Sequence, residues 1–223
     1  LHLQSGQGER ANDCYQEAFR ADPAQDEPFV YLDREARREH RNTESLYLNR
    51  ARALPAGPSR TLAWRKLAQL RTDRGEGVCV GRVVPPNDVR IIAIDDVAHA
   101  DWREVRELPV GEIGEITVLG PTTTEAYFRR DEATRLAKIR RDDSHVHRMG
   151  DVGYFDNAGR LWFCGRKAHI VEAAHGKMFT IPCEAIFNQH PRVFRSALVG
   201  VGRAPQEPVI VVEPEADQFP SNT

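Results

Sequence analysis

The spacing of hydrophobic positions along the chain changes near residue 72. Before that point, small and apolar side chains recur with the period of an amphipathic helix. Helices are therefore predicted at Glu9–Ala21, Glu27–His40, Thr43–Leu54 and Thr61–Leu70. Asp22-Pro23 ends the first of them, because the residue before a proline is pushed out of the helical region. Residues 1–72 are thus predicted to form a helical segment, whose role stays unknown.

From Gly75 onward, short β-branched stretches alternate with glycine and proline, which is typical of strands and turns. Asp156–Gly159 fits a hairpin turn that leads into the next strand. The expected elements are strands at Val78–Val84, Val89–Ile94, Glu115–Leu119, Leu161–Cys164, Arg195–Val201 and Pro208–Val212, a short helix at Cys183–Asn188, and a polar linker at Glu213–Thr223. The predicted fold class is α+β: the helical segment, a β-rich, distorted barrel-like subdomain at 75–166, and the start of a small α+β domain at 167–223.

Composition narrows the classes of function. Hydrophobic residues make up 40% and charged residues 29% of the 223 residues, with a net charge of −2. We therefore expect no electrostatic footprint for nucleic acid, and no apolar stretch approaches the length of a membrane span. The four cysteines, Cys14, Cys79, Cys164 and Cys183, form no CxxC pair. They are interpreted as reduced, mostly buried thiols of a cytoplasmic protein.

The stretch His147–Asp151, followed by Gly165-Arg166-Lys167, carries the candidate chemistry. Gly150 permits a tight turn, and Asp151 could then accept hydrogen bonds from a diol. A hairpin over Gly153–Arg166 would return Arg166 to the side of Asp151. A ribose next to a phosphate needs such a carboxylate and such a cation. A structural salt bridge at a strand end is the alternative.

The surrounding motifs resemble the adenylate-forming (AMP-dependent synthetase/ligase) superfamily. Gly111–Pro121 with Tyr127 is similar to its "GEI…V.GP…Y" segment, and His147–Asp151 resembles "Y-R-T-G-D". Leu161–Arg166 resembles the "…GR" motif. Val78–Ile92 resembles the family's upstream strand pair, "VGRPVPG…VRI". Gly176 with Pro182–Glu184 resembles the segment that follows the "…GR" motif, "G…P.EIE". These five motifs are collinear over about 140 residues. They look most similar to the bacterial olefin-biosynthesis β-lactone synthetases, with fatty acyl-CoA ligases as the near alternative.

The resemblance implies roles for particular residues and ligands. Asp151 would bind the ribose hydroxyls of ATP and of the acyl-adenylate, Arg166 the ribose and the α-phosphate, and Phe163 would pack near the nucleotide. For Phe163, an ordinary core aromatic on a strand is the alternative. Lys167 and Ala168 would form the hinge of the C-terminal domain, although the family often has Asp or Lys where Ala168 stands. The implied ligands are ATP or AMP, Mg²⁺ in the intact family, and an acyl substrate.

Several parts of the family's machinery have no match in these 223 residues. They are the Gly-rich phosphate loop, an aromatic-Gly-x-Thr-Glu motif for Mg²⁺, and a late catalytic Lys that neutralises the α-phosphoryl group. We therefore expect a C-terminal fragment of a ligase that is inactive alone and that self-associates through uncovered apolar surface. A non-catalytic structural or interaction module is the alternative.

Two weaker features complete the sequence-based picture. Ala11, Tyr15, Ala18 and Asp22-Pro23 resemble the second helix of a tetratricopeptide repeat, which would make the helical segment an interaction module. His145 and His147 could lie on one side of a strand as metal ligands do, but a solvated loop is the default prediction and no metal site is expected.

Overall fold

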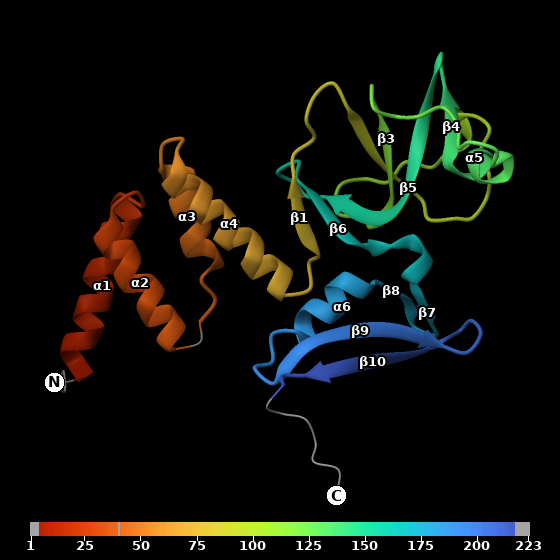
Figure 1. Ribbon diagram of the computed structural model, residues 1–223. Coiled ribbons are helices and arrows are strands. Elements are labelled where there is room, and N and C mark those ends of the chain that lie inside the picture. The colour runs from red at the N-terminus through yellow and green to blue at the C-terminus, as the bar shows by residue number, and fades with distance from the viewer. Residues whose placement is uncertain (1–4, 40, 217–223) are drawn as a thin grey trace, which may run out of the picture. The chain divides into compact units, whose positions relative to one another are not determined.

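A computed structural model describes residues 5–39 and 41–216 of the chain (Figure 1). The chain divides into two compact units, residues 1–70 and residues 71–223. Each unit has its own elements and is described separately. The mixture of helices with a strongly curled sheet confirms the predicted α+β class and its barrel-like middle part (Figure 1).

The first unit consists of helices. They are α1 (Ser5–Ala21), α2 (Asp26–Arg38), α3 (Glu44–Ala53) and α4 (Pro58–Asp73), so the four predicted helices are confirmed with shifted ends. His40, the expected end of the second helix, lies outside the described residues. Pro58 occupies the first position of α4, where a missing N–H costs nothing. The buried residues at the centre of the unit are Tyr47, Ala51, Leu54, Ala63 and Leu67.

A buried arginine ties α3 to the turn between α1 and α2. Arg50 donates hydrogen bonds to the carbonyl oxygens of Pro23, Ala24 and Gln25, and it pairs with Asp26. Its guanidinium also lies 4.2 Å from the centre of the Phe29 ring. These contacts satisfy both the buried cation and the carbonyl groups of the turn between α1 and α2, so Arg50 holds that turn against α3.

The second unit is built on a six-stranded antiparallel sheet with the order β1-β6-β5-β3-β2, in which β4 pairs with β5. The elements of this part are β1 (Val78–Gly81), β2 (Asp88–Ile92), η1 (Trp102–Glu104), β3 (Gly114–Leu119), α5 (Asp131–Ala137), β4 (Lys138–Arg141), β5 (Ser144–Phe155) and β6 (Leu161–Arg166). The fully buried side chains include Ile92, Ile139, Val146, Val152 and Trp162.

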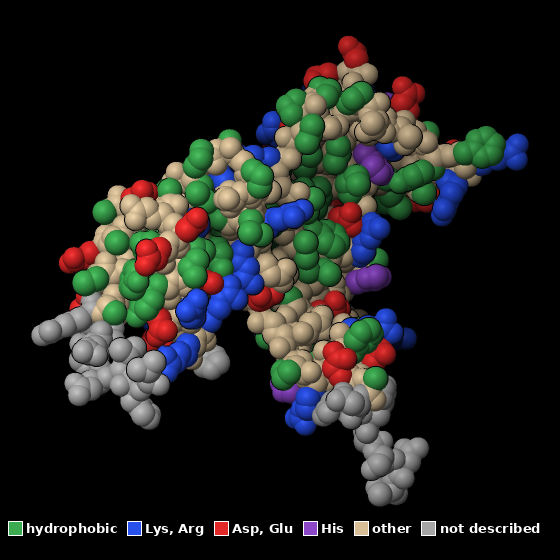
Figure 2. Space-filling model, turned by 60° about the vertical axis from the view of Figure 1, so that its left-hand side comes forward, with side chains coloured by type: hydrophobic (Ala, Val, Ile, Leu, Met, Phe, Trp, Pro, Cys, Tyr) green, Lys and Arg blue, Asp and Glu red, His purple; other side chains and the backbone are tan. Residues whose placement is uncertain are grey.

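The remaining elements continue the chain after the sheet. They are η2 (Lys167–His169), β7 (Val171–Ala173), β8 (Gly176–Met178), α6 (Thr180–Phe187), β9 (Val193–Val201) and β10 (Glu207–Pro214). The hairpins β7–β8 and β9–β10 form two small sheets, and α6 packs against β9. On the face shown in Figure 2, acidic, basic and hydrophobic side chains are interspersed, in keeping with the net charge of −2.

Several predictions about local structure were wrong. The first expected strand ends at Gly81 instead of Val84, ahead of two prolines that cannot donate to a ladder. His145 and His147, expected in a solvated loop, lie on β5. Glu213 and Pro214, expected in a linker, belong to β10, whereas residues 217–223 lie outside the described residues.

The cysteines also differ from expectation. All four are free, but Cys164 is buried, Cys79 and Cys183 are half-buried, and Cys14 is exposed. The prediction of mostly buried thiols was therefore wrong. Burial raises the pKa of the Cys164 thiol to about 12, so this thiol stays protonated and behaves as a small apolar side chain. Within the described residues, no helix combines the length and hydrophobicity needed to cross a membrane.

Candidate nucleotide site

The β5–β6 hairpin is fixed by Asp156 at its turn. The Asp156 carboxylate accepts hydrogen bonds from the backbone N–H groups of Ala158 and Arg160, and from the side chains of Arg160 and Trp162 at 2.7 and 3.0 Å. Burial raises the pKa of Asp156, but these bonds outweigh it and the net pKa lies below the usual value. The turn therefore sets the register up to Gly153 and Phe163, and a one-residue irregularity between Val152 and Gly153 then places Asp151 opposite Arg166.

The structure brings Asp151 and Arg166 together. Arg166 Nη1 lies 2.8 Å from Asp151 Oδ1, and the side chains are 60% and 21% exposed respectively. The contact is an ion pair without hydrogen-bond alignment. Asp151 Oδ1 is buried and accepts no hydrogen bond within the described part of the chain. A buried acceptor next to a largely exposed guanidinium is a place where a ligand hydroxyl and an anionic oxygen could be bound side by side.

Two glycines make this arrangement possible. Gly150 has φ +68° on β5, directly before Asp151, so the predicted turn is a distortion within a strand. Gly165 has φ +131°, and a Cβ there would lie 2.5 Å from Thr180 Oγ1. Only glycine lets the end of β6 approach the start of α6 so closely. This close approach fixes the position of Arg166, the last residue of β6.

Phe163 and the expected hinge residues lie nearby in the chain. Phe163 is half-buried on β6, with Gly153 and Val78 as its neighbours on the flanking strands. Lys167 and Ala168 follow β6 in η2, where Ala168 is exposed. Both hinge residues line a groove of about 520 Å³ together with Asp95, Asp96, Ile170, Glu172 and other residues.

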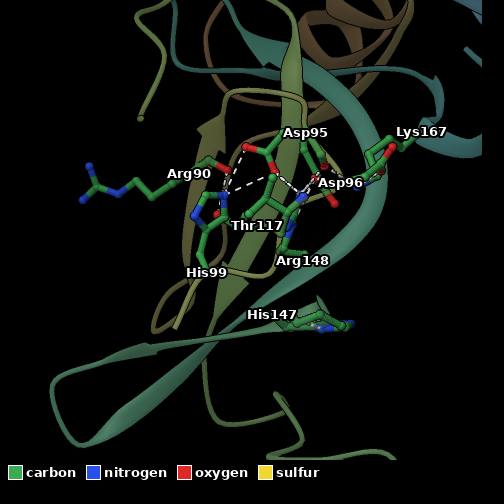
Figure 3. A network of polar contacts seen from close by, with 11 residues as sticks. Arg90, Asp95, Asp96, His99, Thr117, His147, Arg148 and Lys167 are labelled. Carbon is green, nitrogen blue, oxygen red and sulfur yellow. Dashed lines mark hydrogen bonds and ion pairs between the residues drawn. The ribbon is translucent and has the colours of Figure 1, made fainter. Parts of the chain in front are cut away.

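A buried ionic network lies against the hairpin, and sequence reasoning missed it (Figure 3). Glu115 on β3 accepts hydrogen bonds from Arg148 Nε and Nη2 at 3.1 and 2.6 Å. Arg148 also donates to the carbonyl oxygens of Asp95 and Val97, each at 2.6 Å. Lys167 Nζ lies 3.2 Å from Glu115 Oε2 and donates to the Asp95 carbonyl at 2.8 Å. One carboxylate thus connects β3, β5 and the residue after Arg166.

The charges in this network are nearly excluded from water. The side chains of Arg148 and Glu115 are 3% and 2% exposed. Burial lowers the pKa of Arg148, but the Glu115 carboxylate outweighs it and the net pKa is raised. Arg148 therefore stays charged, and it holds the strand segment three residues before Asp151. The network therefore anchors Arg148 on β5 and Lys167 directly after β6, two residues that flank the Asp151–Arg166 pair along the chain.

His147 is a structural residue in this arrangement. Its Nδ1 donates to the Ala137 carbonyl oxygen at 3.3 Å, and its ring meets the edge of Tyr127 at 6.1 Å between centroids. Burial lowers the pKa of His147, and the nearby Lys138 charge lowers it further. Among the described residues, no group of three His, Cys, Asp or Glu side chains could hold a metal ion.

Comparisons with solved structures identify the fold. The anthranilate CoA ligase AuaEII in complex with anthranoyl-AMP matches with a TM-score of 0.52 and 22% identity, over 65% of this chain and 26% of that one. The O-succinylbenzoate coenzyme A synthetase of Bacillus subtilis, in complex with ATP and magnesium ion, matches with a TM-score of 0.52 and 21% identity. The match covers 70% of this chain and 28% of that one. The chain thus contains a domain fold of the adenylate-forming ligases.

Two curated relatives have a much higher sequence identity to this chain. The olefin beta-lactone synthetase of Xanthomonas campestris pv. campestris is 63% identical over 148 residues, or 64% of this chain and 27% of the relative. The olefin beta-lactone synthetase of Stenotrophomonas maltophilia is 56% identical over 164 residues, or 70% of this chain and 30% of the relative. The predicted resemblance is confirmed. The chain spans less than a third of the length of these relatives. No protein-family model matches it.

Proposed function

We propose that residues 71–216 are the part of an ATP-dependent acyl-adenylating synthetase that holds the ribose and the α-phosphate of the nucleotide. The observation that carries the proposal is the Asp151–Arg166 pair, in which a buried carboxylate oxygen has no hydrogen-bond donor among the described residues and an exposed guanidinium lies 2.8 Å away. Residues with these properties fit an adenine nucleotide, because a ribose hydroxyl would supply the missing donor and the guanidinium would face an anionic oxygen.

In this proposal each site residue has one task. Asp151 accepts the ribose hydroxyls, Arg166 contacts the α-phosphate side, and Phe163 packs near the nucleotide. Lys167 and Ala168 form the hinge, and Lys167 is held on the network around Glu115. Bound ATP would supply the adenylyl group that activates the carboxylate of the acyl substrate, with Mg²⁺ as its counterion in the intact enzyme.

The proposed substrate is a β-hydroxy acid that is converted to a β-lactone through acyl-AMP. The support is the contrast in identity: 56–63% to the olefin beta-lactone synthetases against 28–35% to the curated CoA ligases. A fatty acyl-CoA ligase is the second candidate for the same site. Because all four cysteines are free, a reducing, cytoplasmic location is part of the proposal.

We expect the 223 residues alone to form no acyl-AMP at a useful rate. Their sequence has no Gly-rich phosphate loop, and loss of one group that stabilises the transition-state charge costs about two to three orders of magnitude in rate. Nucleotide binding can therefore be measured in the absence of acyl-AMP formation, and a binding assay is enough to test the site.

Nucleotide-dependent stabilisation tests the proposal. A nucleotide present at about ten times its dissociation constant should raise the free energy of unfolding by about 1.4 kcal/mol. For a unit of about 150 residues, this corresponds to a rise of about 3–6 °C in Tm. We expect AMP and ATP to give this shift in the second unit, and Asp151→Ala and Arg166→Gln to reduce it to less than about a third, because binding about tenfold weaker leaves the nucleotide near its dissociation constant.

Matched controls separate the site from a general charge effect. Asp143 and Arg203 are exposed residues of the same unit, so Asp143→Ala and Arg203→Gln change the net charge in the same way. These variants should keep the full shift. If parent and Asp151→Ala behave alike at 10 mM nucleotide, the nucleotide site is refuted and the non-catalytic interaction module is favoured.

A further inference from the structure

The helical unit contains a groove that lies outside the proposed nucleotide site. It has a volume of about 460 Å³ and is formed by α1, α3 and the turn after α1. The lining residues are Phe19, Arg20, Pro23, Asn49, Arg52 and Ala53. The groove therefore combines two cations, one amide and an apolar surface within a single unit.

The two arginines of the groove are available to a ligand. Arg20 and Arg52 are both exposed. Arg20 contacts the Gln16 side chain at 3.3 Å, and neither arginine is paired with a carboxylate among the side chains described in residues 11–39 and 41–216. The nearby acids are engaged elsewhere: Asp22 accepts a hydrogen bond from the Ala24 backbone at 3.0 Å, and Asp26 pairs with the buried Arg50.

The apolar part of the groove is packed against other residues of the helical unit. Phe19 is 6% exposed, and its ring lies 6.4 Å from that of Phe29. Pro23 follows in the turn that Arg50 holds through its carbonyl oxygen. A ligand side chain placed here would lie on a preformed surface, so little conformational entropy is lost on binding.

Positive charge is concentrated in residues 41–70 of the helical unit, which favours an anionic partner at α3. Residues 41–70 contain six Lys and Arg but a single Glu, whereas residues 5–39 contain five Arg and nine Asp and Glu. The excess of positive charge on α3 and α4 would attract acidic segments over a distance of about a Debye length, roughly 8–10 Å at ordinary salt.

We propose that this groove docks an acidic peptide segment of a partner protein. A carboxylate side chain of the segment binds the guanidinium groups of Arg20 and Arg52, which can each donate two parallel hydrogen bonds. A neighbouring apolar side chain of the segment packs on Phe19 and Pro23. The amide of Asn49 can both donate to and accept from the peptide backbone.

The test uses the full chain and an eight-residue peptide of alternating Glu and Leu, labelled with fluorescein and followed by anisotropy. We expect saturable binding that weakens with added NaCl. An exposed ion pair contributes up to about fivefold in affinity, so Arg20→Gln and Arg52→Gln should each weaken binding by about two- to fivefold. Circular dichroism checks that the variants keep their helices.

Arg65→Gln is the matched control. Arg65 is exposed on α4 in the same basic segment and lies outside the groove, so its substitution removes the same charge. Peptide binding should be unchanged in this variant and in the presence of AMP. An equal loss in Arg65→Gln, or no saturable binding at all, would overturn the proposal.

Other anions decide whether the groove is specific for peptides. We expect an eight-nucleotide RNA, vesicles with anionic lipids and 10 mM inorganic phosphate each to leave the bound peptide in place, because none of them offers a carboxylate next to an apolar side chain. Displacement of the peptide by any of the three at comparable concentration would show a general anion site and refute the docking of an acidic peptide.

Discussion

The buried pair of Arg148 and Glu115 gives a sharp prediction about stability. Arg148→Met removes a guanidinium that is 3% exposed and leaves a carboxylate that is 2% exposed. Glu115 keeps Lys167 Nζ at 3.2 Å, and the Asp95 carbonyl oxygen also keeps Lys167 as a donor, whereas the Val97 carbonyl oxygen loses the donor Arg148. Breaking a buried ion pair from one side costs about 3–5 kcal/mol. Because Lys167 remains, we expect about 3 kcal/mol for the second unit.

Denaturant unfolding measures this change. Trp64 lies in the helical unit, so a Trp64→Phe background leaves Trp102 and Trp162 to report on the second unit alone. In that background, Arg148→Met should lower the midpoint of unfolding without changing the slope.

A double variant supplies the control. Replacing both charged residues by apolar ones of similar size is often neutral, so Glu115→Leu combined with Arg148→Met should recover most of the lost stability. The coupling energy between the two substitutions should then exceed about 1 kcal/mol, as expected for residues in contact. A cost of under 1 kcal/mol for Arg148→Met, or additive effects of the two substitutions, would refute the view that this network supports the hairpin.

Two further predictions concern pH and association. Because burial lowers the pKa of His147 in the folded state, the unfolded chain binds protons more readily, and the free energy of unfolding should fall as the pH drops below about 6.5. In His147→Gln this part of the pH dependence should disappear, whereas in the exposed His175→Gln it should stay; an unchanged profile in His147→Gln would contradict the assignment. Val199 and Val211 are exposed on β9 and β10, on the face of the hairpin that also carries Ala197 and Val209, so we propose that this face self-associates. Light scattering of the parent should show oligomers, and the double variant Val199→Thr, Val211→Thr should contain a smaller fraction of them. A parent that is a monodisperse monomer would exclude self-association through this face.

The sequence predicted most elements because their local signals agree with the fold. The helical period before residue 72 and the β-branched stretches after it both correspond to real elements. The hairpin turn at Asp156–Gly159 was also predictable, because the turn residues act locally. That turn brings Asp151 close to the end of β6, but the exact pairing with Arg166 also depends on the irregularity between Val152 and Gly153, which gives no local signal.

The missed features depend on contacts far apart in the chain. The strand β5 contains Gly150 and Gly153 and several polar residues, so it lacks the alternation that marks a strand, and its pairing partners decide its structure. The network joins Glu115 to Arg148 and Lys167, which lie 33 and 52 residues away. The one local hint at the buried glutamate was that Glu115 is the only charged residue of the strand Gly114–Leu119.

The central claim is that Asp151 accepts hydrogen bonds from the ribose of an adenine nucleotide. Isothermal titration of the parent and of Asp151→Ala with AMP and with 2′,3′-dideoxy-AMP tests it directly. A hydrogen bond to a charged group contributes about 1.5–3 kcal/mol, so loss of the ribose hydroxyls should weaken binding to the parent at least about tenfold. The two ligands should bind Asp151→Ala within about twofold of each other, because the acceptor is gone. Equal losses for dideoxy-AMP in both proteins would contradict the account.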